Sequence, residues 1–374
     1  MQELFTSRHL SPSTHKDTIG GTIFRREARC AMKPLLNTLF VNTPDAYLSL
    51  DGGNVAVSVD YQSLGKVPLI NIDSIICFAR SGASPALMSC CIDQNKPMTF
   101  LTPSGRFLGT VVGAVNGNVV LRKQQYRISD DAALAGEFSR NFIIGKLFNQ
   151  RWMVERYIRD HALVIDTQRF KNLSQALFSA IEELRETSDI DTIRGIEGNA
   201  AANYFAHFDD FILQKGSGFS FSERSRRPPL DRTNALLSFA YSLLANDCAA
   251  ALLSVGLDPY VGFMHQDRPG RQSLALDLME ELRGVFADRF VLKLINKQML
   301  DKQDFLEQES GAVMLTDKGR KVFLDQWTAK KQETLTHPFL QEKIVWGLVP
   351  FVQALLLARS VRGDLDSYPA FLWK

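Results

Sequence analysis

Residues 47–59 read Tyr-Leu-Ser-Leu-Asp-Gly-Gly-Asn-Val-Ala-Val-Ser-Val. Two runs of apolar and β-branched residues flank the turn residues 51–54, and this pattern is a strong signal for a β-hairpin. Ser84 followed by Pro85 predicts the start of one helix over 84–95, because serine caps helices and proline suits their first position. Short runs of the same β-like kind recur nearby, at 39–41, 69–70, 71–78, 98–101 and 107–112. We therefore expect a small, mostly β domain.

Beyond about Tyr126 the apolar residues recur every three or four positions, which is typical of helices. A strand or hairpin is expected near 290–315. The predicted fold class is α+β, with a β-rich domain over 32–120 and a larger, all-helical domain over 127–374. Residues 1–31 are polar and are expected to be disordered or loosely attached. Helices are expected over 130–160, 167–186, 190–214, 233–255, 273–290, 315–332 and 338–361.

Composition limits the classes of function. The net charge of +2 is too close to neutral to indicate a nucleic-acid-binding protein, so any basic surface must be local. Five cysteines, an odd number without a CxxC pair, indicate reduced thiols in a cytosol rather than disulfides or zinc. The apolar run 235–257 contains Asn246 and Asp247, and a charge is costly in lipid. We expect a buried helix there, and no membrane span.

The run 265–283 is the strongest candidate for a chemical site. His265 and an Arg/Gly turn lead into an apolar helix, with Ser273 as the expected N-cap. Asp277 and Glu280 share one face of that helix and repel each other unless a cation lies between them. A hard, oxygen-seeking metal bound also by one imidazole is the natural cation. Glu281 lies four residues from Asp277, so periodicity alone does not choose between Glu280 and Glu281. The alternative is a satisfied core histidine beside a solvated acidic face.

A second acidic position lies in the run Arg194-Gly195-Ile196-Glu197-Gly198. Each glycine inside a helix costs about 1 kcal/mol relative to alanine. A close approach by a ligand would justify both glycines, with Glu197 as a metal ligand facing a phosphate. A helix-packing contact that needs small residues is the equally weighted alternative.

Arginines are densest in the loop 215–232, which also contains a Pro-Pro pair that stiffens it. Guanidinium groups bind phosphates in a two-pronged geometry. The alternative is a solvated charged loop, the commonest fate of such runs. The candidate DNA-binding residues, from this loop and from the turn after His265, are Arg224, Arg226, Arg227, Arg268 and Arg271.

Four motifs occur in a fixed order between residue 32 and the C-terminus. Together they resemble the CRISPR-associated protein 1 family, the integrase of CRISPR adaptation. Residues 36–41 and 368–372 resemble the branch that accompanies type I-C systems. The motifs are Arg194-Gly195-x-Glu197-Gly198, Arg226-Arg227-Pro228-Pro229-x-Asp231-x-x-Asn234, Gly256-Leu257-Asp258-Pro259-Tyr260-x-Gly262-Phe263-x-His265 and Ser273-Leu274-x-Leu276-Asp277-Leu278-Met279-Glu280-Glu281-x-Arg283.

The resemblance implies a site and partners. It makes Glu197, His265 and Glu280 the ligands of Mg²⁺ or Mn²⁺, with Asp277 as a neighbouring catalytic acid, and so selects Glu280 over Glu281. It implies a cytoplasmic homodimer formed largely through the N-terminal domains, and two such dimers bridged by a dimer of CRISPR-associated protein 2. CRISPR-associated protein 4 is a further partner that it suggests. Residues 1–31 have no counterpart in the family.

The implied reaction is attack by the 3′-hydroxyl of a captured double-stranded DNA fragment on a phosphodiester at the CRISPR repeat boundary. With water as the nucleophile, the same site is an endonuclease. His265 is either a metal ligand or a proton shuttle, and the sequence does not decide between them. Two other classes of function remain open. One is a metal-dependent nuclease or recombinase outside CRISPR adaptation, and the other is a non-catalytic DNA-binding scaffold.

Overall fold

The predicted hairpin is present in the N-terminal β region. In the computed structural model, β2 (Tyr47–Asp51) pairs antiparallel with β3 (Asn54–Val59), which pairs with β4 (Gln62–Pro68). Gly52 and Gly53 both have positive φ angles, 54° and 78°, as this tight turn requires. The structure describes residues 38–374 except 42, 44, 73, 79–81, 95, 103–106, 112, 114–118 and 215. The prediction for residues 1–31 lies outside this range.

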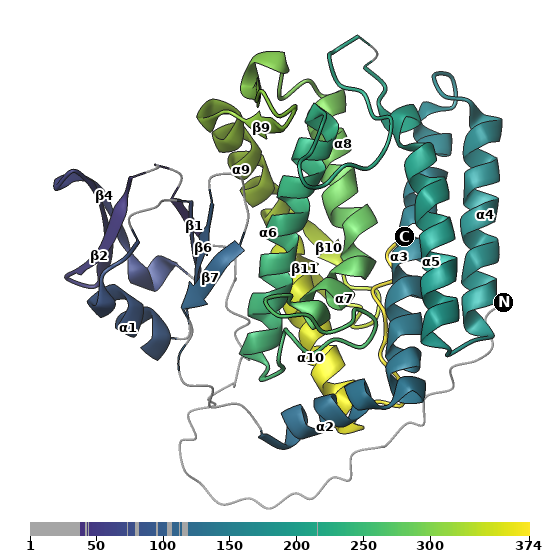
Figure 1. The fold of residues 1–374 in the computed structure, drawn as a ribbon, viewed down its shortest axis with the longest axis horizontal. Helices are drawn as coiled ribbons and strands as arrows, with labels where there is room; N and C mark the ends of the chain where they lie inside the picture. Colours follow the sequence, from purple (N-terminus) through teal and green to yellow (C-terminus); the bar gives the residue numbers. More distant parts are fainter. Residues whose placement is uncertain are drawn as a thin grey trace, which may run out of the picture. The chain divides into compact units, whose positions relative to one another are not determined.

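A second sheet has the strand order β1-β5-β6-β7 (Figure 1). Its strands are β1 (Thr38–Val41), β5 (Ser74–Cys77), β6 (Met98–Leu101) and β7 (Phe107–Val111), with β5 parallel to β1 and β6. The helix α1 (Pro85–Asp93) begins where predicted, because the Ser84 hydroxyl accepts the backbone N–H of Leu87. The predicted strand at 69–70 is wrong, since Leu69–Asn71 is a short 3₁₀ helix and the strand precedes it as β4. β4 is mostly exposed, so it lacks an apolar pattern.

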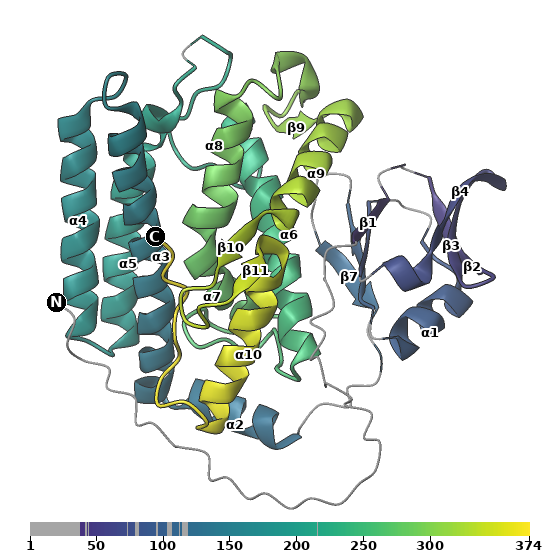
Figure 2. The same ribbon diagram turned by 180° about the vertical axis from the view of Figure 1, so that it is seen from behind.

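The rest of the chain is largely helical, which confirms the predicted fold class. α3, α4 and α5 run side by side in both views (Figures 1 and 2). The helices are α2 (Val119–Asp130), α3 (Ala132–His161), α4 (Thr167–Arg185), α5 (Ile190–Ala206), α6 (Arg232–Ser254), α7 (Ser273–Leu282), α8 (Arg289–Asn296), α9 (Asp317–Gln332) and α10 (Val349–Arg362). α2 begins before Tyr126, so the helical pattern starts earlier than predicted.

Two of the predicted helices end earlier than expected. α5 ends at Ala206, and a 3₁₀ turn, Phe208–Phe211, follows it. α7 ends at Leu282, and a π-helical turn, Arg283–Asp288, joins it to α8. The region is also not wholly helical. The hairpin β8–β9 (Phe305–Glu307, Val313–Leu315) lies where one was expected, whereas β10–β11 (Thr334–Thr336, Lys343–Val345) replaces the predicted start of α10.

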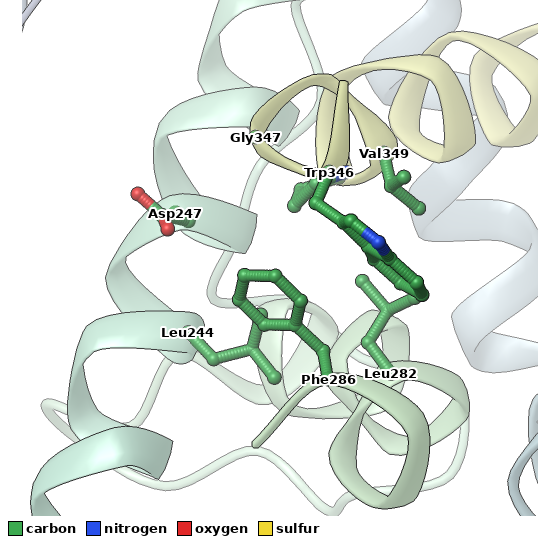
Figure 3. Close-up of a pocket in the computed structure, with 8 residues that line it drawn as sticks. Leu244, Asp247, Leu282, Phe286, Trp346, Gly347 and Val349 are labelled. Atoms are coloured by element: carbon green, nitrogen blue, oxygen red, sulfur yellow. The ribbon is translucent and has the colours of Figure 1, made fainter. Parts of the chain in front are cut away.

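α6 is long and apolar enough to cross a membrane, but 67% of its most apolar window is buried inside the protein. Asp247, in its second half, forms an ion pair of 2.9 Å with Lys331. Leu244 on the same helix meets Phe286 and Trp346 in a contact that leaves no room for a water molecule (Figure 3). α6 is therefore a core helix of this fold, as the sequence predicted.

Candidate active site

Three carboxylates on α7 are buried, and this excludes the alternative of a solvated acidic face. Asp277 and Glu281 have no exposed surface, and Glu280 is 3% exposed. A buried carboxylate is costly unless hydrogen bonds, cations or protonation compensate it. The three side chains meet different neighbours, so each is compensated in its own way.

Asp277 holds the loop that contains His265. Its Oδ2 accepts the backbone N–H groups of Phe263 and Met264 at 2.7 and 3.0 Å. Its Oδ1 accepts the His265 backbone N–H at 3.0 Å and lies 2.6 Å from His265 Nδ1. The histidine thus folds back over the helix start. Nδ1 is engaged, so Nε2 is the ring nitrogen left for other chemistry.

The loop lies very close to the start of α7. A Cβ added at Gly262 would lie 2.7 Å from the Ser273 Cβ, so only glycine fits there. The prediction that Ser273 is the N-cap is wrong, because Gln272 holds that position without a side-chain bond. The Ser273 hydroxyl instead donates to the carbonyl of Gln266 at 3.1 Å. The Ser273 side chain therefore stabilises the loop that contains His265, and it does not cap the helix.

Glu280 lies between two cations that sequence reasoning did not identify. Arg283 donates to Glu280 Oε1 at 2.6 Å, and Lys146 Nζ from α3 lies 2.8 Å from Oε2. Burial alone would raise the pKa of Glu280, but Arg283 and Lys146 outweigh it and hold that pKa far below its usual range. Oε2 is buried and has charge compensation from Lys146 without a directed hydrogen bond.

The same lysine also bonds Glu197 on α5. Only 3% of the Lys146 side chain is exposed, against 21% for Glu197. One ammonium group thus lies between two acids that are 83 residues apart in sequence. Lys146 occupies the apolar stripe of α3, next to buried Ile143 and Leu147. A charged residue at such a position is the signal that could have revealed it.

α5 presents Glu197 on an open surface. Cβ atoms added at Gly195 or Gly198 would meet no atom of the described residues within 4 Å. The helix-packing explanation for these glycines therefore fails, and the space beside Glu197 is free for a ligand. One turn earlier, Arg194 donates to the carbonyl of Met264 at 2.6 Å. This bond ties α5 to the loop that contains His265.

Neighbouring acids change the pKa of His265. Burial lowers the pKa of its imidazole, but the hydrogen bond and charge of Asp277 and the charge of Glu280 together raise it above its usual value. The side chain is 26% exposed, so the ring is accessible from solvent. Its imidazole completes a set of two carboxylates and one nitrogen.

Carboxylate oxygens together with one imidazole nitrogen are ligand types that suit Mg²⁺ or Mn²⁺. Glu280 Oε2 is a buried oxygen without a hydrogen bond, and Glu197 borders open space. As they stand, the described side chains include no group of three or more His, Cys, Asp or Glu residues arranged to hold a metal ion. The ammonium of Lys146 occupies the position between the two carboxylates. A divalent cation that binds Glu197 and Glu280 would have to displace this ammonium group.

The five predicted DNA-binding arginines differ in their surroundings. Arg224 turns inward and donates to Asn234 Oδ1 at 2.6 Å and to the Ser238 hydroxyl at 3.1 Å. Arg271 is bonded to the carbonyl of Gln266. The remaining three are exposed and form no ion pair within the described part of the chain: Arg226, Arg227 and Arg268.

Arg283 also contacts a buried polar network. Its guanidinium lies 4.4 Å from the ring centre of Tyr241 on α6. Tyr241 and Tyr204 donate to the carboxylate of Asp288, at 2.5 and 3.1 Å. Burial raises the pKa of Asp288, although these donors and Arg283 oppose the rise. The π-helical turn carries both Arg283 and Asp288, and so links this network to Glu280.

Comparison with known proteins gives the family. A family model described as "CRISPR associated protein Cas1" matches residues 39–329. A relative from Chlorobaculum tepidum, named CRISPR-associated endonuclease Cas1 1, is 46% identical over 92% of this chain and 100% of its own length. A relative from Geobacter sulfurreducens, named a CRISPR-associated exonuclease Cas4/endonuclease Cas1 fusion, is 34% identical over 89% of this chain and 60% of its own length.

Solved structures share the fold. One is titled a casposase bound to integration product, with a TM-score of 0.77 and 23% identity over 90% of this chain and 94% of that chain. Another is titled a Cas6-RT-Cas1–Cas2 complex, with a TM-score of 0.75 and 21% identity over 91% of this chain and 36% of that chain. At these identities the likeness extends to the fold alone.

Proposed function

The chain belongs to the CRISPR-associated Cas1 family, whose relatives are named endonucleases, and we propose that it inserts foreign DNA fragments into a CRISPR array. One observation carries the proposal. Two acids from different helices, Glu197 and Glu280, share a single cation, the charge of Glu280 acts on His265, and the surface around Glu197 is open. Such a set suits a metal-dependent reaction at a phosphate.

Glu197, Glu280 and Nε2 of His265 would hold Mg²⁺ or Mn²⁺. When bound, such an ion stabilises negative charge that develops on a phosphoryl oxygen. Asp277 acts through His265, because its bonds fix the ring and the loop. It is thus a positioning residue in this proposal. Nε2 is the nitrogen that Asp277 does not bind, so it is the atom through which His265 would act as a metal ligand or as a proton shuttle.

The reaction is a transesterification. The 3′-hydroxyl of the fragment forms a new bond to phosphorus, the existing phosphodiester bond breaks, and the proton passes to the departing 3′-oxygen. Residues of this chain orient the strands, which lowers the barrier by positioning. Arg226, Arg227, Arg268 and Arg271 contact phosphates, while Arg224 supports the loop that contains Arg226 and Arg227 through Asn234. Water in place of the 3′-hydroxyl gives endonuclease activity.

The partners are double-stranded DNA, a second copy of the chain and Cas2, and the protein acts in the cytoplasm. The neighbour whose title names a Cas1–Cas2 complex supports the Cas2 dimer as a partner. The relative that is named a Cas4/Cas1 fusion supports Cas4 as a further partner. Residues 36–41 and 368–372 support the type I-C branch. The proposed domains cover 32–120 and 127–374, and α2 spans the interval between them.

The test uses Glu197→Gln and Glu280→Gln, which keep shape and remove a charge, with Glu342→Gln on the exposed surface as the matched control. We expect each site variant to bind Mn²⁺ more than about 100-fold more weakly, by calorimetry, and to lose strand transfer into a repeat-containing duplex. The control should retain both. Wild-type strand transfer by either site variant would refute the proposal.

Two further measurements separate the alternative functions. Equal transfer into repeat-containing and random duplexes would favour a nuclease or recombinase outside CRISPR adaptation. Absence of any Mg²⁺- or Mn²⁺-stimulated cleavage or transfer by the wild type would favour a DNA-binding scaffold. Circular dichroism confirms that each variant is folded before these rates are compared.

A further inference from the structure

A second cationic site lies on α3, on a part of the helix that the candidate active site does not use. A cavity of about 450 Å³ opens between α3, the start of α8 and the C-terminal residues. None of the active-site residues described above lines it. The C-terminus lies beside α3 in Figure 2, and the Trp373 N–H donates to Asn149 Oδ1 at 3.0 Å. The cationic and aromatic lining residues are Trp152, Arg156, Arg159, Arg289, Trp373 and Lys374.

Two of these cations are held close together without a carboxylate. The guanidinium carbons of Arg156 and Arg289 lie 5.2 and 5.1 Å from the ring centre of Trp373. Within the described residues, neither arginine forms an ion pair. The charges of Glu333 and Asp160 act on Arg289. Both acids are already bonded, Glu333 to Lys293 and Lys330 and Asp160 to Arg159. Two guanidinium groups on one indole repel each other, and an anion between them removes that repulsion.

The other polar groups of the cavity are mainly donors. The indole N–H of Trp152 is buried and has no acceptor among the described residues. Lys374 Nζ lies 5.3 Å from the ring centre of the same indole. Glu155 is the one carboxylate side chain among the described lining residues, and the Ser174 hydroxyl and Arg151 already engage it. Guanidinium forks, an ammonium and a free N–H form a set that recognises phosphate oxygens.

We propose that this cavity binds a phosphate of the DNA backbone outside the active site. Arg159 and Lys374 are exposed at its rim, so a polymer can reach it as well as a small ion. DNA is the polyanion that the proposed function brings to the protein, and the proposal rests on that function for the identity of its ligand. The site positions a strand while the reaction takes place elsewhere, because phosphate contacts fix register and orientation.

The test is DNA binding by Arg156→Gln/Arg289→Gln, measured by fluorescence anisotropy in EDTA at several salt concentrations. EDTA separates binding from the metal-dependent reaction. We expect binding about 10-fold weaker than wild type, and a salt slope smaller by about 0.9 for duplex or 0.7 for single-stranded DNA, from the loss of one phosphate contact. The control is Arg185→Gln, which removes an exposed, ion-paired arginine on α4 and should bind DNA like the wild type.

Trp152→Phe removes the indole donor and keeps an aromatic ring, so it should weaken DNA binding by a smaller factor than the double variant does. Unchanged affinity and salt slope in a folded double variant would overturn the proposal. A cavity that binds inorganic phosphate, while the double variant binds DNA normally, would also overturn it in favour of a small-anion site. Glu197→Gln distinguishes the two hypotheses, because it should bind DNA normally and still lose strand transfer.

Discussion

Replacing Glu281 by glutamine should change how the stability of the protein depends on pH. Glu281 is fully buried, and it accepts hydrogen bonds from Tyr368 at 2.5 Å, from the Phe371 N–H at 2.7 Å and from Gln353 at 3.0 Å. Burial outweighs these donors and raises the pKa of the carboxyl from its ordinary value of 4.5 to about 7. The rise corresponds to about 3 kcal/mol, because each pKa unit is worth about 1.4 kcal/mol.

The direction of the effect follows from proton linkage. The folded protein holds the Glu281 proton more tightly than the unfolded chain does. This stabilisation is therefore complete below pH 4.5, and it is lost as the pH rises through about 7. Glutamine does not titrate, and the hydrogen bond that it loses costs the same at every pH. The wild type should thus be more stable than the variant by a margin that narrows by about 3 kcal/mol between pH 4.5 and 8.

The measurement is urea denaturation in EDTA at closely spaced pH values, followed by tryptophan fluorescence. All four tryptophans lie in the helical region, so the signal reports the part of the chain that contains Glu281. Subtracting variant from wild type cancels the other titrating groups. Glu342→Gln, an exposed substitution, should give a difference that does not vary with pH. A margin for Glu281→Gln that is equally constant would refute the reasoning.

Two further substitutions test the electrostatics of the site. Lys146→Met should cost the metal-free protein about 4 kcal/mol, because Glu197 and Glu280 lose their shared cation. Mn²⁺ should then raise the thermal midpoint more than in the wild type, and an equal rise would contradict the idea that lysine and metal compete. Asp277→Asn should cost about 3 kcal/mol, since an amide cannot accept all the loop N–H groups. Faster limited proteolysis near His265, compared with wild type, checks that result, and an unchanged cleavage rate would count against it.

Local patterns predicted the elements of the fold well, and long-range partners poorly. The Gly-Gly turn and the period of three to four residues identified the hairpin and the helices. The π-helical turn after Leu282 escaped prediction, because its apolar pattern continues that of α7. β4 escaped because its exposed side chains carry no apolar alternation. Both depend on tertiary packing rather than on local sequence.

The sequence predicted the acidic residues of the candidate site but not the cationic residues that pair with them. Asp277 and Glu280 share a helix, so spacing places them together without knowledge of the fold. Lys146 and Glu197 come from α3 and α5, and nothing in their local sequence fixes how those helices pack on α7. The two flanking glycines suggested Glu197 as a ligand, and family resemblance joined it to His265 and Glu280, because a family pattern carries information on contacts that spacing lacks. Lys146 remained hidden, since no motif contains it.

The three buried acids of α7 are compensated by different means, and this difference bears on which one binds metal. Asp277 is held by backbone N–H groups, which are fixed in place and would have to be broken for it to bind an ion. Glu281 is compensated largely by its proton near neutral pH, and its neighbours are donors from the C-terminal segment. Only Glu280 is balanced by a cation that also bonds a second acid, and a lysine on a flexible stem can withdraw from it. Replacing one positive charge by another leaves the rest of the helix undisturbed. On physical grounds, therefore, we expect Glu280, rather than either neighbour, to be the ligand on this helix.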